Sequence, residues 1–256
     1  MAETILNWKG YDWINGQPWG EAHPSPDVIC YADKDETVLN SDGSITLDIN
    51  NKEKFFDGDV NHTKKFGCGW VSTNNGFLFG DFHFEYKLPK GANLWPAIWL
   101  SGVHTWPPEI DIMEGWSGNG YLCKNKPNYK RFPLFNNIHP GLFYFKVDGK
   151  VYSKGYGSFG SDCATYSWLQ KLDDWNTCDL VWRKDLIEVY YNGHRVMRVT
   201  EDDEDRGFHM LDFMGHEMYV CLDAAVQDDF TQDNYKQYKK SGSPFIIRDF
   251  TYTSHE

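Results

Sequence analysis

Three carboxylates interrupt an apolar stretch at residues 106–114, which reads Trp106-Pro107-Pro108-Glu109-Ile110-Asp111-Ile112-Met113-Glu114. The segment after the prolines alternates like a buried β-strand, whose side chains point to opposite faces in turn, so Glu109 and Asp111 share one face. Strict alternation would turn Glu114 to the apolar face, but a β-bulge of one extra residue around Ile112 and Met113 would return it. We therefore expect a bulged strand that holds three acids on one face.

Such a strand has a spacing that suits double displacement at a sugar. Successive same-face positions lie about 6.6 Å apart, so the outer two acids lie about 13 Å apart at the backbone. Glutamate side chains that lean toward each other over Asp111 could bring their carboxyl groups to the roughly 5–5.5 Å of a retaining glycosidase. One glutamate must then be ionised and the other protonated. The charge of Asp111 disfavours ionisation of a neighbour, which helps to separate the two pKa values.

A purely structural role for the three acids is the alternative. It is disfavoured, because three unpaired acids buried in an apolar strand would cost several kcal/mol of stability.

Length and charge narrow the classes of protein. The chain has 256 residues and no Pro/Gly/Ser-rich linker, so we expect one domain over residues 1–256, and a monomer. Its 25 basic and 37 acidic residues give a net charge of −12, which argues against nucleic acid and anionic membrane as partners. The 17% of aromatic residues suit stacking on sugar rings, and a β-rich core favours them as well.

Targeting and metal signals are sparse. No run of about 18 apolar residues is present, so no transmembrane helix is expected. The first residues lack the charged and apolar regions of a secretory signal. We expect a secreted, periplasmic or cell-surface protein whose signal is absent from this chain, with an intracellular protein as the alternative. The six cysteines form no C-x-x-C pair, so a zinc site is not expected, and their even number permits disulfides without requiring them.

Short strand-like runs separated by turn residues recur along the chain. Asp42-Gly43, Asp148-Gly149 and Asn192-Gly193 predict hairpin turns. This pattern predicts an all-β fold, an antiparallel β-sandwich. The polar segment 228–240 predicts a short surface helix or a loop. The expected strands cover residues 44–50, 77–88, 94–100, 109–114, 142–147, 177–183, 186–192, 218–226 and 245–252.

Two motifs suggest other functions and are rejected. Residues 155–160 match the G-x-G-x-x-G pattern of dinucleotide sites, but no amphipathic helix follows within a βαβ unit. The acidic run 201–205 lacks the spaced ligands and the central glycine of an EF-hand loop, so a solvated loop is expected.

A series of motifs resembles glycoside hydrolase family sixteen, the group of laminarinases, agarases and carrageenases. The acidic segment 109–114 is similar to its signature in the bulged form, which is one residue longer. The other similar segments are a strand with a lysine-leucine-proline turn, a tryptophan-rich strand, a strand pair that ends in a turn, the last cleft strand and the terminal strand, at residues 79–91, 94–100, 175–193, 219–226 and 245–252.

The resemblance implies a jelly-roll sandwich whose concave sheet forms an open cleft. It implies an endo-acting, retaining hydrolase of a β-linked polysaccharide, with Glu109 as nucleophile, Glu114 as acid/base and Asp111 as auxiliary acid. A β-1,3-glucan of the laminarin type is the expected substrate. A galactan of the agar, porphyran or carrageenan type and mucin-type glycans remain alternatives, as do a non-catalytic carbohydrate-binding protein and a transglycosylase.

The resemblance also points to residues that would contact the sugar chain. Trp106 is expected to form the floor of the sugar site. Trp95 and Trp99 share a strand face, and we expect one to line the cleft and the other to pack in the core. Asp223 stands where the family frequently has asparagine. Trp116 is expected to shape the leaving-group side. The remaining candidates, each of which has a packing role as its alternative, are Trp70 and His139.

No cofactor is required by this chemistry, but many family members bind a structural calcium on the convex face. Asp249 and the Gly43 carbonyl match two of the ligand positions, and the N-terminal partner is not recognisable. The resemblance therefore predicts a structural calcium ion bound by these two positions.

Overall fold

The computed structural model describes residues 3–23, 28–57, 63–117, 135–145, 151–155, 166–200, 213 and 215–255. Several features expected from the sequence lie outside these residues. They are the turn at 148–149, most of the glycine motif at 155–160, the acidic run 201–205, Cys123 and Cys163.

The described chain folds into short and long strands, one helix and two 3-10 turns. The strands are β1 Thr4–Trp8, β2 Tyr11–Asn15, β3 Cys30–Ala32, β4 Thr37–Leu39, β5 Ile45–Leu47, β6 Ile49–Asn50, β7 Lys54–Phe55, β8 Thr63–Lys64, β9 Phe66–Cys68, β10 Trp70–Thr73, β11 Gly80–Lys87, β12 Leu94–Gly102, β13 Glu109–Ser117, β14 Phe135–Phe145, β15 Val151–Gly155, β16 Asn176–Arg183, β17 Leu186–Tyr191, β18 His194–Thr200, β19 Met218–Val226 and β20 Phe245–Thr253. The helix α1 covers Gln232–Ser241, and the 3-10 turns cover Lys34–Glu36 and Ser167–Leu169.

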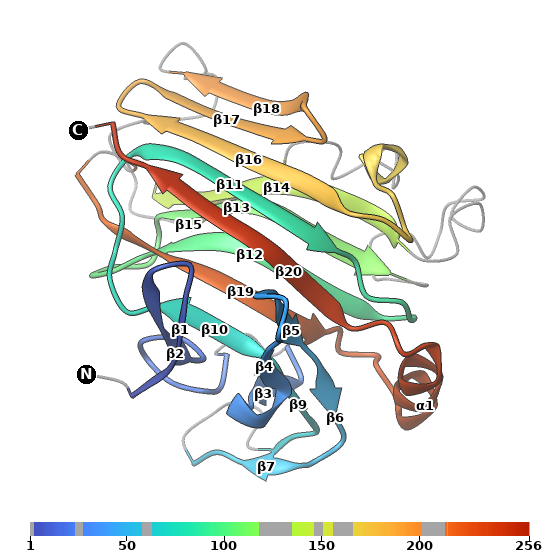
Figure 1. Ribbon diagram of the computed structural model, residues 1–256. Helices are drawn as coiled ribbons and strands as arrows, with labels where there is room; N and C mark the ends of the chain where they lie inside the picture. Colours follow the sequence, from blue (N-terminus) through green and yellow to red (C-terminus); the bar gives the residue numbers. More distant parts are fainter. Residues whose placement is uncertain are drawn as a thin grey trace.

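Two large antiparallel sheets lie face to face (Figure 1). One has eight strands in the order β1-β2-β10-β19-β12-β13-β14-β15, and we call it the cleft sheet. The other has seven strands in the order β18-β17-β16-β11-β20-β5-β4, and we call it the outer sheet. Several neighbours in each sheet are distant in sequence, as β12 pairs with β19 and β11 with β20. The all-β antiparallel sandwich expected from the sequence is confirmed.

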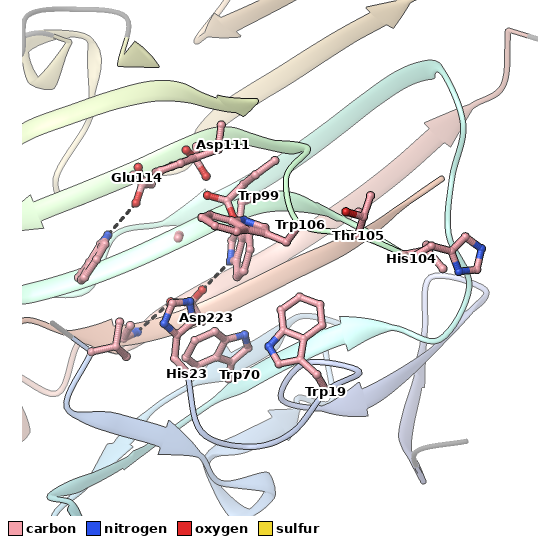
Figure 2. Close-up of a pocket in the computed structure, with 18 residues that line it drawn as sticks. Trp19, His23, Trp70, Trp99, His104, Thr105, Trp106, Asp111, Glu114 and Asp223 are labelled. Carbon is pink, nitrogen blue, oxygen red and sulfur yellow. Dashed lines mark hydrogen bonds between the residues drawn. The ribbon is translucent and has the colours of Figure 1, made fainter. Parts of the chain in front are cut away.

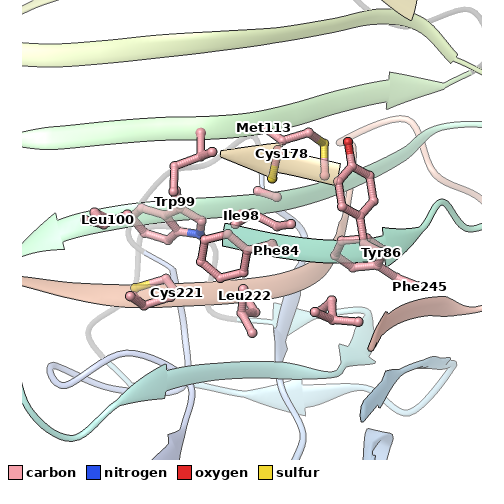
Figure 3. Close-up of a cluster of buried hydrophobic side chains, with 14 of the residues drawn as sticks. Phe84, Tyr86, Ile98, Trp99, Leu100, Met113, Cys178, Cys221, Leu222 and Phe245 are labelled. Carbon is pink, nitrogen blue, oxygen red and sulfur yellow. The ribbon is translucent and has the colours of Figure 1, made fainter. Parts of the chain in front are cut away.

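The core fills the space between the sheets. In β11 the side chains of Phe82, Phe84 and Tyr86 are buried, while the residues between them are partly exposed, as strand alternation predicts. Figure 3 shows Phe84 of the outer sheet against Ile98 and Leu222 of the cleft sheet. The central strands β12, β13 and β19 are buried on both faces, because one face packs in this core and the other lines the cleft.

The helix α1 begins with a capping box. The Thr231 side chain accepts from the Asn234 N–H, and the Asn234 side chain accepts from the Thr231 N–H. Gly242 ends the helix at φ 61°. Tyr238 and Lys239 bind Asp48 at 2.7 and 2.8 Å, which holds the helix on the N-terminal half of the chain. Of the two expectations for the polar segment, the helix is the one that forms.

Some expected boundaries are wrong. The strand expected at 142–147 begins at Phe135, and the one expected at 77–88 begins at Gly80. The strands β1 and β2 were not expected, because polar residues such as Asn7 and Asp12 mask their alternation. None of the described helices is long and apolar enough to cross a membrane. The four described cysteines are thiols, and the Sγ atoms of Cys30 and Cys68 lie 3.2 Å apart.

Candidate active site

The expected bulge in β13 is present. Met113 pairs with Ile98 of β12 and Asp111 with the next residue, Trp99, so Ile112 is the extra residue. The same irregularity is seen in the pairing with β14. Asp111 pairs with Gly141 and Glu114 with His139, so an advance of three residues on β13 matches an advance of two on β14. Because of this shift, Glu109, Asp111 and Glu114 all line one cleft. The predicted placement of the three acids on one face is confirmed.

The surroundings of the bulge hold it in place. Ile112 and Met113 are fully buried, and the Tyr191 hydroxyl of the outer sheet donates to the Ile112 carbonyl at 2.9 Å. Gly141 on β14 lies so close to Asp111 that a Cβ there would be 2.7 Å from Asp111 Oδ2. The glycine is therefore required for the carboxylate to fit against the neighbouring strand.

The cleft is an open hollow of about 800 Å³ on the face of the cleft sheet (Figure 2). Aromatic rings make up much of its wall, and four carboxyl groups lie at its base. Its lining consists of Trp19, His23, Val28, Trp70, Trp95, Ala97, Trp99, Gly102, Val103, His104, Thr105, Trp106, Glu109, Asp111, Glu114, Phe143, Asp223 and Ala225.

Three indole N–H groups donate to three of the acids. Trp106 Nε1 donates to Glu109 Oε2 at 2.7 Å, and Trp95 Nε1 donates to Glu114 Oε1 at 3.0 Å. Trp99 Nε1 donates to the Oδ2 atom of the fourth acid at 2.8 Å. That acid is Asp223, which pairs with Ala97 across β12 and β19. Each of these carboxyl groups is thus oriented by a rigid ring from a neighbouring position.

Burial raises the pKa of every acid in the cleft. The pKa of Glu114 lies well above its usual range because of burial and the charges of Asp111 and Glu109. The pKa of Glu109 is raised well above its usual range by burial and Asp111, and the Trp106 N–H opposes the shift. Burial raises the pKa of Asp111 and of Asp223 to about 7. These shifts favour the protonated form of a carboxyl group in the cleft, which is the form that general acid catalysis requires.

The sugar-binding candidates divide into two groups. Trp70, Trp95, Trp99, Trp106 and Asp223 line the cleft. The expectation that only one of Trp95 and Trp99 would do so is wrong, because Ile98 and Leu100 fill the core from the opposite face of β12. Trp106 is 46% exposed, and its ring lies 5.6 Å from that of Phe143.

Trp116 and His139 lie beside the cleft and do not line it. The Trp116 ring stacks on the His139 ring, with 4.7 Å between the ring centres and 12° between the planes. The centre of the Trp95 ring lies 5.3 Å from that of Trp116. His139 pairs with Glu114 across β13 and β14. Burial lowers the pKa of His139 to about 4, so its ring is neutral near pH 7. These two rings support Trp95 and the acid from the side.

Some lining residues were missed in the sequence. Trp19 follows Pro18 and precedes Gly20, a turn with an aromatic tip, and this signal could have identified it. His23 stacks on Trp70 at 5.5 Å and 25°, but nothing in its sequence context indicates this. Phe143 belongs to a strand that was expected. That its side chain faces the cleft follows only from its pairing with Glu109 on β13.

The two expected calcium ligands have other partners. Lys9 Nζ lies 2.7 Å from Asp249 Oδ1, and the Trp8 indole donates to the Gly43 carbonyl at 2.7 Å. Burial raises the pKa of Asp249, but the bond and charge of Lys9 outweigh it and hold the pKa below its usual value. A calcium ion takes about six to eight oxygen ligands, and an ammonium group beside the carboxylate repels it. The residues as arranged do not fit calcium.

Comparison with known proteins places the chain in a family. The family described as "Glycosyl hydrolases family 16" matches residues 27–239. The chain is 27% identical over 207 residues to glucan endo-1,3-beta-glucosidase A1 of Niallia circulans, covering 75% of this chain and 26% of that protein. It is 33% identical over 164 residues to glucan endo-1,3-beta-glucosidase of Cryptopygus antarcticus, covering 61% of this chain and 57% of that protein. The chain thus spans about a quarter of the first relative and just over half of the second.

A solved structure has a similar fold. The crystal structure of LamAcat from Zobellia galactanivorans has a TM-score of 0.64 and 15% identity, and the match covers 94% of this chain and 90% of that chain. At this identity the likeness concerns the jelly-roll sandwich alone. The family match covers most of the chain, and its acidic strand has the bulge that brings three carboxyl groups together. The chain belongs to the glycosyl hydrolases family 16.

Proposed function

We propose that the protein is an endo-acting, retaining β-glycoside hydrolase whose substrate is a β-1,3-glucan. The observation that carries the proposal is the bulged strand β13, which places two glutamates on either side of Asp111 at the base of an open, aromatic cleft. Two relatives that are named glucan endo-1,3-beta-glucosidases support the choice of polymer. A cleft open along the sheet suits attack within a chain.

In this proposal Glu109 attacks the anomeric carbon and Glu114 protonates the leaving oxygen. Trp106 holds the Glu109 carboxylate through its N–H and favours the ionised form. Burial and the charge of Asp111 keep a proton on Glu114. After the leaving group departs, Glu114 accepts a proton from water, which attacks the glycosyl ester and releases Glu109. Asp111 is the auxiliary acid that orients and separates the pair.

The aromatic residues would bind the sugar chain. Trp106 presents an exposed ring next to Glu109, as a floor for the sugar that is attacked. Trp95 lies by Glu114, so it would contact the leaving-group side, with Trp116 and His139 behind it. Trp70, Trp99 and Asp223 also line the cleft, and they would supply apolar surface and a hydrogen-bond acceptor.

The test is hydrolysis by variants of the two glutamates. Glu109→Gln leaves no nucleophile, so hydrolysis of laminarin should fall at least about a thousandfold. Glu114→Gln should lose laminarin hydrolysis but retain the first step on an aryl glycoside, whose leaving group needs no proton. A trapped glycosyl ester on Glu109, identified by peptide mass, is the expected direct proof. Activity near the parent level in Glu109→Gln would exclude the assignment.

The same measurements separate the alternatives. A non-catalytic binding protein would bind laminarin without releasing reducing ends, and a transglycosylase would form longer oligosaccharides from short ones. A panel of laminarin, mixed-linkage glucan, agarose, porphyran, carrageenan and mucin glycans tests the polymer. We also infer that the protein acts outside the cytoplasm, because polysaccharides do not cross membranes unaided. That it is a monomer stays a prediction.

A further inference from the structure

A short turn carries an exposed tryptophan at one end of the cleft. Gln17 and Gly20 exchange two backbone hydrogen bonds of 3.0 and 2.9 Å, so Pro18 and Trp19 form the tip. The proline fixes its own φ, and the paired bonds fix the two ends. Trp19 is 47% exposed, and within the described part of the chain its ring stacks on no other aromatic ring. The backbone of the turn is thus held in place, and it presents an exposed ring that can contact a ligand.

The turn is fastened to the floor of the cleft. The Gly16 N–H donates to the Trp70 carbonyl at 2.8 Å, and the Ser72 hydroxyl donates to the Gly16 carbonyl at 2.6 Å. Gly16 has φ +71°, and a Cβ there would meet the Gly20 carbonyl at 2.8 Å, so only glycine fits. These contacts tie the tryptophan to β10, one of the strands that carries the cleft.

Trp19 lines a second hollow as well as the cleft. This hollow, which we call the polar hollow, measures about 540 Å³ and lies between the turn and strand β3. A volume of about 300–1,000 Å³ is typical of ligand pockets. Its wall includes Asn15, Gln17, Glu21 and Asp33. Because one ring borders both hollows, a chain that lies in the cleft can continue over Trp19 into the polar hollow.

The chemistry of the polar hollow suits a neutral sugar. The Gln17 side chain is 3% exposed, and neither atom of its amide has a hydrogen-bond partner. Asn15 donates to Glu21 at 3.3 Å, and its Oδ1 atom has no partner. Sugar hydroxyls both donate and accept, so they can satisfy amide and carboxylate groups of this kind. Lysines and acids are mixed around the hollow, which gives no preference for a strongly charged ligand.

The position of Trp19 relative to the acids indicates which side of the cleaved bond it would bind. Figure 2 shows Trp19 at the end of the cleft that lies away from Glu114, on the side of Trp106 and His104. If Glu114 protonates the leaving group, the leaving-group side lies beyond Glu114. Trp19 then lies on the opposite side, where the part of the chain that becomes bound to Glu109 is held.

We propose that Trp19 and the polar hollow form a distal binding site for a neutral glycosyl unit on the side of the substrate that forms the covalent intermediate. The inference rests on the proposed function and deepens it. The site makes the enzyme prefer long chains, because only a chain that extends past Trp106 reaches Trp19.

The test compares chain lengths. Linear β-1,3-gluco-oligosaccharides of three to eight units, labelled at the reducing end, are hydrolysed by the parent and by Trp19→Ala. We expect kcat/KM of the longest oligomers to fall about twofold to tenfold, the range that about 0.5–1.5 kcal/mol of ring stacking gives, with the shortest oligomers unchanged. The labelled products should also show cleavage moving toward the non-reducing end. Trp19→Tyr should restore most of both effects.

The controls separate this inference from the proposed function. Trp168→Ala removes another exposed tryptophan, 65% exposed and outside the cleft lining, and should change neither readout. If the parent hydrolyses no oligosaccharide or polymer of the panel, the proposed function fails. If the parent is active but Trp19→Ala loses activity equally at all lengths, loses none, or shifts cleavage toward the reducing end, the distal site is excluded.

Discussion

Two indole N–H groups act on the two catalytic acids, one on each acid. In a retaining hydrolase the acidic limb of kcat/KM reports ionisation of the nucleophile, and the basic limb reports loss of the proton from the acid. Trp106 stabilises ionised Glu109, and Trp95 stabilises ionised Glu114. Each tryptophan therefore lowers one pKa, against the much larger effect of burial.

Substitution of each tryptophan should move a different limb. Trp106→Phe removes the bond that favours ionised Glu109, so the acidic limb should move up by about one pH unit. Trp95→Phe raises the pKa of Glu114 in the same way, so the basic limb should move up instead. The pH profile of kcat/KM measures both, with Trp168→Phe as a control that moves neither. Movement of the wrong limb would exchange the two roles.

Asp223 gives a pH dependence of stability. Burial raises its pKa to about 7 in the folded state, above the 3.8 of the free side chain. The folded protein then binds more protons than the unfolded chain between these values, so the free energy of unfolding falls as pH rises toward about 7 and then levels off. Asp223→Asn removes this fall. Its melting temperature relative to the parent should rise from pH 5 to pH 8, and a constant difference would contradict the raised pKa.

The bulge is the element on which the acid geometry depends, and one hydroxyl group of the outer sheet supports it. Tyr191→Phe leaves the Ile112 carbonyl buried without its partner, which should cost about 1–3 kcal/mol of stability. Because that carbonyl belongs to the bulge, we also expect kcat to fall while KM changes little.

The matched control for the bulge is Tyr86→Phe. Its hydroxyl, equally buried in the same core, donates to Gln170 Oε1 at 2.8 Å, and Gln170 lies outside β13. This variant should lose similar stability and keep its kcat. Equal effects of both variants on kcat would mean that the bulge needs no support from Tyr191.

Elements differ in how well the sequence predicts them. The bulge in β13 was predictable, because three acids in an apolar strand have only one register that keeps them together. The cleft lining on β12 was not predictable. Alternation places Trp95 and Trp99 on the same face of the strand, but only the packing of the two sheets decides whether that face lies in the core or in the cleft. The N-terminal hairpin of β1 and β2 was not predicted, because its polar residues interrupt the alternation of apolar and polar side chains that marks a strand.

At the scale of the molecule, the sandwich follows from alternation and turn residues that recur along the whole chain. The cleft does not, because its walls come from segments that meet only after folding. Trp70 lies on β10, Asp223 on β19 and Glu109 on β13, more than a hundred residues apart at the extremes. Pairings such as that of Trp70 with Asp223 combine two strands whose sequences share no local signal.

The two sheets are also joined at the N-terminus, where Lys9 links the β1–β2 hairpin of the cleft sheet to Asp249 of the outer sheet. An ammonium group here neutralises the carboxylate that a calcium ion would otherwise bind. We therefore expect neither 5 mM calcium nor a chelator, each at roughly the same ionic strength, to change the melting temperature of the parent by more than about 1 °C.

Lys9→Met should lower the melting temperature by about 1–3 °C, because the two side chains are each 33% exposed and a pair of this kind contributes about 0.2–1 kcal/mol. Lys9→Arg keeps the charge and should stay near the parent. Stabilisation of the parent by calcium would show that the ion displaces Lys9 from Asp249, and the ammonium group would then not be the cation that joins the two sheets.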